Sequence, residues 1–378
     1  MRSRYLNQLT TPYLFGAVTD QVERHPNPVN LGVGDVSLPL PSCIVEQLQE
    51  QAALFGTETG FKGYGPEHGL SSLREKIAKT FYPMLSADEI FISDGAKTDI
   101  GRLQFLFDPS ITIALQNPTY PTYKEAAILS GKTSFIDLPT LPSNNFFPQD
   151  LPKADLYIIC SPHNPTGHAL TRAQLQHLID TARQHKSFIL FDAAYASFIQ
   201  DPNLVKTPYE LEGAEEVVIE INSFSKLIGF TGLRLSWTVV PKKLHFRDGQ
   251  SVHRDWSRLV STYYNGTSRL TQAAGHAALS QEGLQAIHQY MQIYRQQAQS
   301  LKQALSPYFD KIYGAEHAPY LWIAASPSYF ERMGIITIKG EGFGSHGQGF
   351  VRLSALGSSY TIQEAIRRCS QFANLSLT

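Results

Sequence analysis

The sequence predicts an α/β protein with a large domain on a mostly parallel sheet and a smaller α+β domain. From about Cys43 to about Ser261, short apolar runs typical of buried strands alternate with helical segments, which favours a mostly parallel sheet. From about Leu270 to Leu305 the pattern becomes long and helical, and short strands and a closing helix from Thr361 follow. A chain of 378 residues is long enough for two domains.

We therefore divide the chain into three parts. Residues 1–42 are expected to form an N-terminal arm and part of the small domain, residues 43–265 the large domain, and residues 266–378 the small C-terminal domain. This division rests on where the α/β alternation begins and ends.

The first informative strand covers residues 154–160 and ends in a turn rich in Pro and Gly, so Asn164 is expected at its carboxyl end. Thr171 and Gln174 then form a capping box. A helix of about four turns should follow, with its apolar face made by Leu175, Leu178, Ile179 and Ala182.

Two further strands present polar residues in the same way. Residues 187–191 form a buried run with Asp192 and Tyr195 just past its end, and residues 217–221 lead to Ser223, Ser225 and Lys226. Because ligands of open α/β sheets bind outside the carboxyl ends of the strands, these side chains predict one common site.

An anion site is predicted after the strand at residues 90–92. Residues 93–97 make a glycine turn that opens an amphipathic helix containing Ile100, Leu103 and Phe107, and unpaired N–H groups point outward at such a helix start. Lys97 is poorly placed in that first turn unless an anion lies nearby. Ser223, Ser225 and Arg234 would complete a phosphate cradle.

Lys226 is the predicted catalytic residue. A lysine needs desolvation or nearby positive charge, such as Arg234, before its amine becomes a good nucleophile. The aldehyde that recurrently takes a lysine as a Schiff base is pyridoxal phosphate, and its partner is an acid facing the pyridinium nitrogen, a role for Asp192. Tyr195 and Asn164 suit the ring's 3-oxygen. Tyr120, in the rigid turn at residues 117–121, suits stacking on the ring.

The order of these motifs resembles the fold-type I aminotransferases, which are pyridoxal-phosphate enzymes with a seven-stranded type of sheet. The segments that carry this resemblance are residues 95–97, 117–121, 164–167, 192–195 and 223–226. A second set is similar to the LL-diaminopimelate aminotransferases, with the likeness running from about Tyr13 to Gly357: residues 31–35, 62–69, 93–97, 191–195, 229–232 and 351–357.

The resemblance implies a ping-pong reaction, through the Lys226 Schiff base, that converts tetrahydrodipicolinate and glutamate into LL-diaminopimelate and 2-oxoglutarate. It implies a homodimer, with Tyr64 reaching the phosphate of the neighbouring subunit, and a small domain that closes on the substrate. The implied cofactor contacts are Tyr64, Ala96, Lys97, Tyr120, Asn164, Asp192, Tyr195, Ser223, Ser225, Lys226, Arg234 and Asn265. The implied substrate contacts are Tyr13, Gly34, Lys97, Tyr120, Asn164, Asn265 and Arg352.

Arg352 also makes chemical sense by itself, because a guanidinium binds a carboxylate with two parallel hydrogen bonds. Glu67 is a hypothesis for the distal ammonium of a diamino acid. The chain departs from the family at residues 339–344, and residues 325–335 look shortened. Both changes concern the choice of amino donor more than the cofactor.

Other interpretations start from single residues. Taken alone, Lys226 is a surface lysine, Asn164 a turn former, Asp192 a helix cap and Arg352 an exposed strand residue. The close functional alternatives are a broad amino acid aminotransferase and a β-eliminating C–S lyase. A regulatory module that binds the cofactor without turnover would need a DNA-binding domain and a basic arm, and neither is visible.

Two motifs are false leads. Residues 342–347 match the G-x-G-x-x-G spacing, but the next segment, 350–353, looks like a strand, so the helix of a dinucleotide site is missing. Cys160 and His163 are spaced like half of a metal site without a second half, so we expect no metal.

Composition excludes several classes of function. Thirty-two basic residues against thirty-three acidic ones leave no surplus charge for nucleic acid. Three cysteines do not make a disulfide framework. The first residues lack the apolar stretch of a signal peptide, and no segment has the apolar length of a membrane span. We therefore expect a cytoplasmic enzyme of small molecules.

Overall fold

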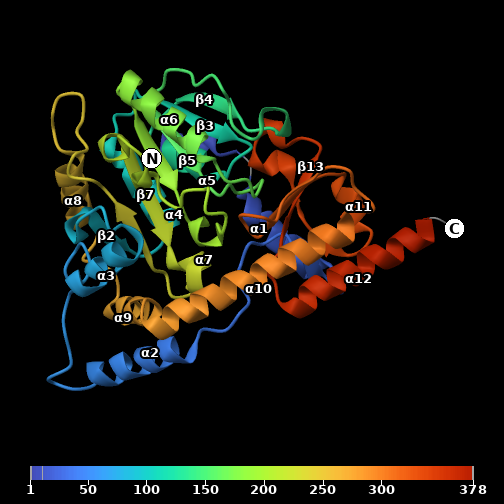
Figure 1. Cartoon of the computed structure of the whole chain (residues 1–378), viewed down its shortest axis with the longest axis horizontal. Coiled ribbons are helices and arrows are strands. Elements are labelled where there is room, and N and C mark those ends of the chain that lie inside the picture. Colours follow the sequence, from blue (N-terminus) through green and yellow to red (C-terminus); the bar gives the residue numbers. More distant parts are fainter. Residues whose placement is uncertain (1, 11, 377–378) are drawn as a thin grey trace.

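A seven-stranded sheet forms the centre of the computed structural model, which describes residues 2–10 and 12–376 (Figure 1). Its strand order is β2-β8-β7-β6-β5-β3-β4, and only β8 runs antiparallel to its neighbours. In that order the strands are Ile90–Ser93, Ser236–Val239, Val218–Ser223, Phe188–Asp192, Leu156–Cys160, Thr112–Asn117 and Ser134–Pro139. The predicted mostly parallel α/β sheet is confirmed.

Helices flank this sheet because its strands are apolar on both faces. Strands β5 and β6 are buried at every position, which is typical of parallel strands covered on both sides. Helix α6 begins with the predicted capping box, in which Thr171 and Gln174 exchange hydrogen bonds. The helices of this part are α2 (Ser42–Phe55), α3 (Ser71–Phe81), α4 (Ala96–Leu103), α5 (Thr122–Leu129), α6 (Arg172–His185), α7 (Phe224–Ile228), α8 (Val252–Tyr263) and α9 (Arg269–Ala278).

Some predicted boundaries were wrong by a few residues. Asp192 is the last residue of β6 and not the first beyond it, because the ladder continues to the pair with Cys160. Strand β7 starts at Val218 and includes Ser223. Helix α4 ends at Leu103 and tightens into a 3-10 turn over Gln104–Leu106, so Phe107 is not part of it.

A second sheet with four antiparallel strands follows in the C-terminal part. Its order is β12-β13-β10-β9, with strands Ile338–Lys339, Phe350–Ser354, Tyr320–Ala324 and Ile312–Gly314. Helices α10 (Gln281–Leu305), α11 (Pro327–Glu331) and α12 (Ser359–Ser376) accompany it (Figure 1). Apolar side chains of α10 and α12 fill its core together with β10 and β13, including Leu301, Leu321, Val351 and Ile362.

The N-terminal arm packs on this second sheet region. Helix α1 (Leu14–Arg24) is followed by β1 (Val29–Asn30), which pairs in parallel with β11 (Ile335–Ile336). Val29 and Leu31 are buried in the second core. The arm therefore lies next to strands from the C-terminal part of the chain, which are far from it in sequence.

Helix α10 belongs to both cores. Ile287 and Met291, in its first half, pack in the core of the large sheet, whereas Leu301 and Leu305 pack in the second core. The domain limits at residues 42 and 265 stay a prediction, because this helix connects the two parts continuously.

The segment with G-x-G-x-x-G spacing is a turn between strands, as predicted. Two 3-10 turns, Gly340–Phe343 and Ser345–Gly347, lead directly into β13. Over the described ranges 2–10 and 12–376, no helix has both the length and the apolar character needed to cross a bilayer.

Candidate active site

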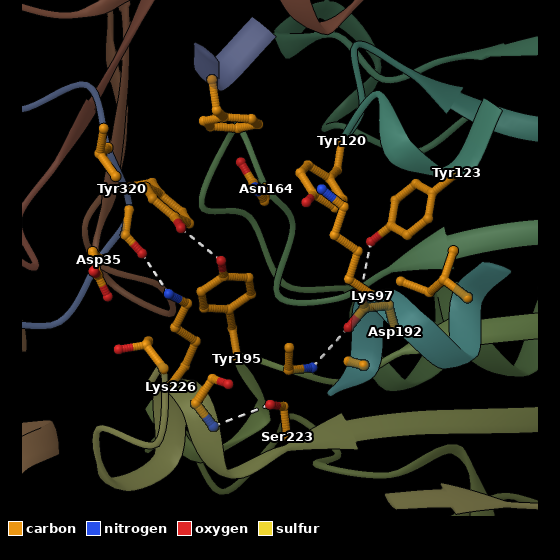
Figure 2. Close-up of a pocket in the computed structure, with 18 of the residues that line it drawn as sticks. Asp35, Lys97, Tyr120, Tyr123, Asn164, Asp192, Tyr195, Ser223, Lys226 and Tyr320 are labelled. Carbon is orange, nitrogen blue, oxygen red and sulfur yellow. Dashed lines mark hydrogen bonds between the residues drawn. The ribbon is translucent and has the colours of Figure 1, made fainter. Parts of the chain in front are cut away.

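A cavity of about 360 Å³ lies at the carboxyl ends of β5, β6 and β7. Most of the predicted site residues line it: Tyr13, Gly34, Ala96, Lys97, Tyr120, Asn164, Asp192, Tyr195, Ser223, Ser225, Lys226, Arg234 and Arg352. Figure 2 shows the side chains of Asn164, Asp192, Tyr195 and Lys226 around this space. The fold thus brings together side chains that are up to 339 positions apart, from Tyr13 to Arg352.

Lys226 presents a buried amine to the cavity. It lies in the short helix α7, whose N-terminal cap is Ser223, and its Nζ donates a hydrogen bond to the carbonyl oxygen of Gly34. Burial lowers the pKa of Lys226 to about 8, aided by the positive charges of Arg352 and Arg234 and opposed by Asp35. A sizeable fraction of the amine is therefore neutral near pH 8, and a neutral amine is the nucleophilic form.

Asp192 is held by two hydrogen bonds at the end of β6. The Tyr123 hydroxyl donates to its Oδ2 at 2.7 Å, and the Ala194 N–H donates to its Oδ1 at 3.0 Å (Figure 2). Burial raises the pKa of Asp192, while these two hydrogen bonds oppose that rise. A buried carboxylate without a cationic partner is costly, so the site favours a positively charged group placed beside it.

A glycine turn lies at the cavity where α4 begins. Gly95 is its N-terminal cap with φ of 133°, and a Cβ on this residue would collide with the guanidinium of Arg234. Ser223, Ser225 and Arg234 line the same cavity. Glycine is therefore required at position 95 because the guanidinium approaches the turn so closely.

The N-terminal arm forms a small network with Lys97, in the first turn of α4. Lys97 Nζ donates to the Tyr13 hydroxyl at 2.8 Å and lies 4.2 Å from the centre of its ring. The Tyr13 and Tyr120 hydroxyls are 3.2 Å apart. These contacts fix the arm against the turn after β3 and place three polar groups at the cavity rim.

Arg352 is buried in the middle of β13 and points across the cavity. Its Nη1 donates to Asn164 Oδ1 at 2.7 Å and its Nη2 donates to the Gly32 carbonyl oxygen at 2.5 Å. Its buried Nε has no hydrogen-bond partner among the described residues. A fully buried guanidinium without a carboxylate beside it is costly, so this position favours an incoming carboxylate.

Three lining residues with ionisable side chains were not predicted as site residues: Asp35, Tyr123 and Tyr320. Tyr123 is the second residue of helix α5, and Tyr320 is the first residue of an apolar strand, so each has the pattern of a core residue. Asp35 lies within a segment that carries the family resemblance but was given no role. Asp35 could have been predicted as a site residue from the sequence, because it directly follows Gly34, a predicted substrate contact.

Tyr64, Glu67 and Asn265 lie outside the cavity of their own chain. Tyr64 is 84% exposed, and Asn265 is exposed as well. Their segments pack against each other, because Arg269 donates to the carbonyl oxygens of Gly63 and Tyr64, and Ser261 donates to Glu67. The three residues therefore belong to one surface region.

The fold and the cavity define a fold-type I aminotransferase, with a lysine presented at the carboxyl edge of a seven-stranded sheet. The family model "Aminotransferase class I and II" matches residues 26–369. The chain belongs to this family, and it is an aminotransferase.

Sequence comparison with named relatives gives more detail than the family model. The chain is 44% identical to LL-diaminopimelate aminotransferase of Protochlamydia amoebophila, with 97% of this chain and 96% of the relative covered. It is 38% identical to the chloroplastic LL-diaminopimelate aminotransferase of Arabidopsis thaliana, with 98% and 86% covered.

Solved structures agree on the fold. The L,L-diaminopimelate aminotransferase of Chlamydomonas reinhardtii superposes with a TM-score of 0.94 at 41% identity, with 98% of each chain covered. The aspartate aminotransferase of Thermus thermophilus superposes with a TM-score of 0.84 at 22% identity, with 98% of this chain and 100% of that chain covered, and this likeness concerns the fold alone.

Proposed function

We propose that the enzyme transfers the amino group of glutamate to tetrahydrodipicolinate, whose ring opens by uptake of one water, and releases LL-diaminopimelate and 2-oxoglutarate. The observation that carries the proposal is the full-length similarity to relatives of that activity, combined with a cavity that presents Lys226, Asp192 and Arg352 together. From composition, we place this reaction in the cytoplasm.

The cavity fits pyridoxal phosphate. A buried lysine with a lowered pKa suits an aldehyde, and a buried carboxylate without a cationic partner suits a pyridinium nitrogen. The glycine turn with Arg234, Ser223 and Ser225 supplies the donors for a phosphate. When bound, this cofactor supplies the electron sink for carbanion chemistry at the amino acid's Cα.

The chain's own residues then divide the remaining tasks. Lys226 holds the aldehyde, and its freed amine moves the proton at the substrate Cα as general base and acid. Asp192 keeps the ring nitrogen protonated. Arg352, with Asn164 at its side, binds the substrate carboxylate and fixes the Cα–H bond relative to Lys226.

A second copy of the chain would complete the site. Tyr64, Glu67 and Asn265 lie on an exposed surface, and large apolar side chains are exposed along the same segments, including Phe61 and Tyr263. We propose that this surface is the homodimer interface, so that Tyr64 reaches the neighbouring cofactor phosphate and Asn265 contacts the neighbouring site. Exposed apolar side chains of this size are typical of subunit interfaces.

Glu67 is the proposed contact for the distal ammonium of diaminopimelate, again from the neighbouring subunit. Glu67→Gln removes the charge and keeps the shape, so the KM for LL-diaminopimelate in the reverse reaction should rise about tenfold. The KM for glutamate should change by less than about twofold, because glutamate has no distal ammonium. Equal increases for both substrates would reject the role.

A product assay with tetrahydrodipicolinate and a panel of amino donors tests the proposed function. LL-diaminopimelate should form with glutamate and should require Lys226. Formation of pyruvate and ammonia would identify a C–S lyase instead. Transfer to many keto acids, but not to tetrahydrodipicolinate, would identify a broad amino acid aminotransferase.

A further inference from the structure

Tyr320 touches both the cofactor side and the substrate side of the cavity. It is the first residue of β10 and is 1% exposed. Its hydroxyl lies 2.6 Å from the hydroxyl of Tyr195 (Figure 2). Its ring lies 4.5 Å from the guanidinium carbon of Arg352. One side chain from the second sheet is therefore in contact with a proposed cofactor residue and with the proposed carboxylate clamp.

Gly34 makes room for this hydroxyl. A Cβ at position 34 would lie 2.6 Å from the Tyr320 oxygen, which is too close for any other residue without a shift. The carbonyl oxygen of the same Gly34 accepts the hydrogen bond of Lys226. The Tyr320 hydroxyl is thus enclosed by the arm, by the end of β6 and by β10.

The proton arrangement between the two phenols follows from their surroundings. Only one of the two hydroxyl protons can lie between the oxygens, so one phenol donates and the other directs its own proton elsewhere. Burial raises the pKa of both phenols, more strongly that of Tyr195, and the charge of Arg352 opposes the rise in both. The guanidinium carbon of Arg352 lies 4.5 Å from the ring of Tyr320, and this nearby positive charge favours Tyr320 as the donor.

The ring of Tyr320 also supports Arg352. The guanidinium carbon lies 4.5 Å from this ring, 5.0 Å from that of Phe343 and 5.5 Å from that of Phe15. Cation–π contacts of this kind fix the plane of a guanidinium without occupying its N–H donors. The donors then stay oriented toward the cavity and Asn164.

We propose that Tyr320 is a positioning residue with two separable roles, one for its hydroxyl and one for its ring. The hydroxyl donates to Tyr195 and leaves the proton of Tyr195 free to point at the 3-oxygen of the cofactor. The ring holds Arg352 in the plane that binds the substrate carboxylate. This inference rests on the proposed function, because both roles refer to that cofactor and an amino acid substrate.

Two substitutions separate the roles. Tyr320→Phe removes the hydroxyl and keeps the ring, and Tyr320→Leu removes both. Tyr313→Phe, on the neighbouring strand β9 and outside the cavity, is the matched control. The readouts are the pH titration of the absorbance of the bound cofactor, the cofactor dissociation constant, the KM for glutamate, and the thermal midpoint of each protein without cofactor.

The hydroxyl role predicts a spectral change in both Tyr320 variants. A weaker donor to the anionic 3-oxygen should raise the pKa of the absorbing group by about 0.5 to 1 unit. The cofactor dissociation constant should rise about threefold. Tyr320→Phe should keep the KM for glutamate within about twofold, whereas Tyr320→Leu should raise it about tenfold. Tyr313→Phe should change none of these.

Different failures are distinguishable. A Tyr320→Phe titration identical to that of the wild type, with cofactor bound at Lys226, would overturn the hydroxyl role and leave the proposed function intact. Equal KM values in the Phe and Leu variants would overturn the ring role. If Tyr320→Leu does not fold, Tyr320→Phe still tests the ring role. A tenfold increase of its KM for glutamate would overturn that role, because the remaining ring would then not hold Arg352 in place. A wild-type protein without any cofactor absorbance would overturn the proposed function and this inference with it.

Discussion

The two ends of the cavity are built in different ways. At the proposed cofactor end, Asn164, Asp192 and Lys226 come from the consecutive segments at the ends of β5, β6 and β7. At the proposed substrate end, Tyr13 and Arg352 come from opposite ends of the chain. One end is thus a property of a single sheet, and the other exists only when the arm, the second sheet and the large sheet are packed together.

Because of this difference, we expect that cofactor capture and substrate binding can be changed separately. Substitutions at the strand ends should alter cofactor capture, and substitutions in β10 and β13 should alter substrate KM. Gly34 connects the two ends, because it accepts the hydrogen bond of Lys226 and contacts Tyr320.

The largest effect is expected for Lys226→Ala. This change removes the amine that holds the aldehyde and moves the proton, so kcat should fall on the order of 10⁴-fold. Amino transfer from glutamate, measured as 2-oxoglutarate formation, checks this. A variant that transfers amino groups at the wild-type rate would contradict the assignment.

The pH dependence of cofactor capture comes next. The pKa of Lys226 is lowered to about 8, so the neutral amine disappears as the pH falls below 8. The rate at which cofactor-free protein binds the aldehyde should drop about tenfold per pH unit below 8 and level off above it. A rate that keeps rising to about pH 10 would indicate an ordinary lysine. Stopped-flow absorbance measures this directly.

Arg352→Lys should affect the other end of the cavity. The charge remains but the two parallel hydrogen bonds to a carboxylate are lost, so the KM for glutamate should rise about 10- to 30-fold. The midpoint of cofactor capture should stay near pH 8, because the positive charge that helps to lower the pKa of Lys226 is kept. A shifted pH midpoint of cofactor capture with an unchanged KM for glutamate would contradict the assignment, because Arg352 would then act at the cofactor end and not at the substrate end.

The smallest effect is expected for Tyr123→Phe. This change removes the 2.7 Å hydrogen bond to Asp192, which raises the pKa of that carboxyl further and weakens its charge. The cofactor dissociation constant should rise about three- to tenfold, with the KM for glutamate unchanged. Tyr157→Phe, whose hydroxyl donates to the Pro152 carbonyl oxygen at the other end of β5, is the control. Equal losses in both variants would point to a general loss of stability.

The same difference explains what the sequence could predict. Asn164, Asp192 and Lys226 follow apolar strands whose order in the chain is also their order in the sheet, so their convergence was predictable. The helix after Thr171 was predictable from its capping box. Tyr123 and Tyr320 were not, because an aromatic residue in an apolar helix or strand has the pattern of a core residue, and only the packing shows that its hydroxyl meets a polar partner.

The residues at the proposed substrate end could be predicted only by combining the family resemblance with the hydrophobic pattern of the sequence. Arg352 lies in an apolar strand and is fully buried, which periodicity alone does not distinguish from a partly exposed strand residue. The segment at residues 339–344, which departs from the family, forms a 3-10 turn that places the Phe343 ring 5.0 Å from the Arg352 guanidinium. That contact depends on the pairing of β12 with β13, which no local signal specifies.

Borohydride reduction after addition of pyridoxal phosphate, followed by peptide mass mapping, tests the central claim most directly. Lys132 is a built-in comparison, because burial lowers its pKa to about 8 as well, but it donates to the Gln104 carbonyl oxygen and does not line the cavity. The account predicts one reduced adduct, on Lys226. An adduct on Lys132 in its place, or none on Lys226, would contradict it.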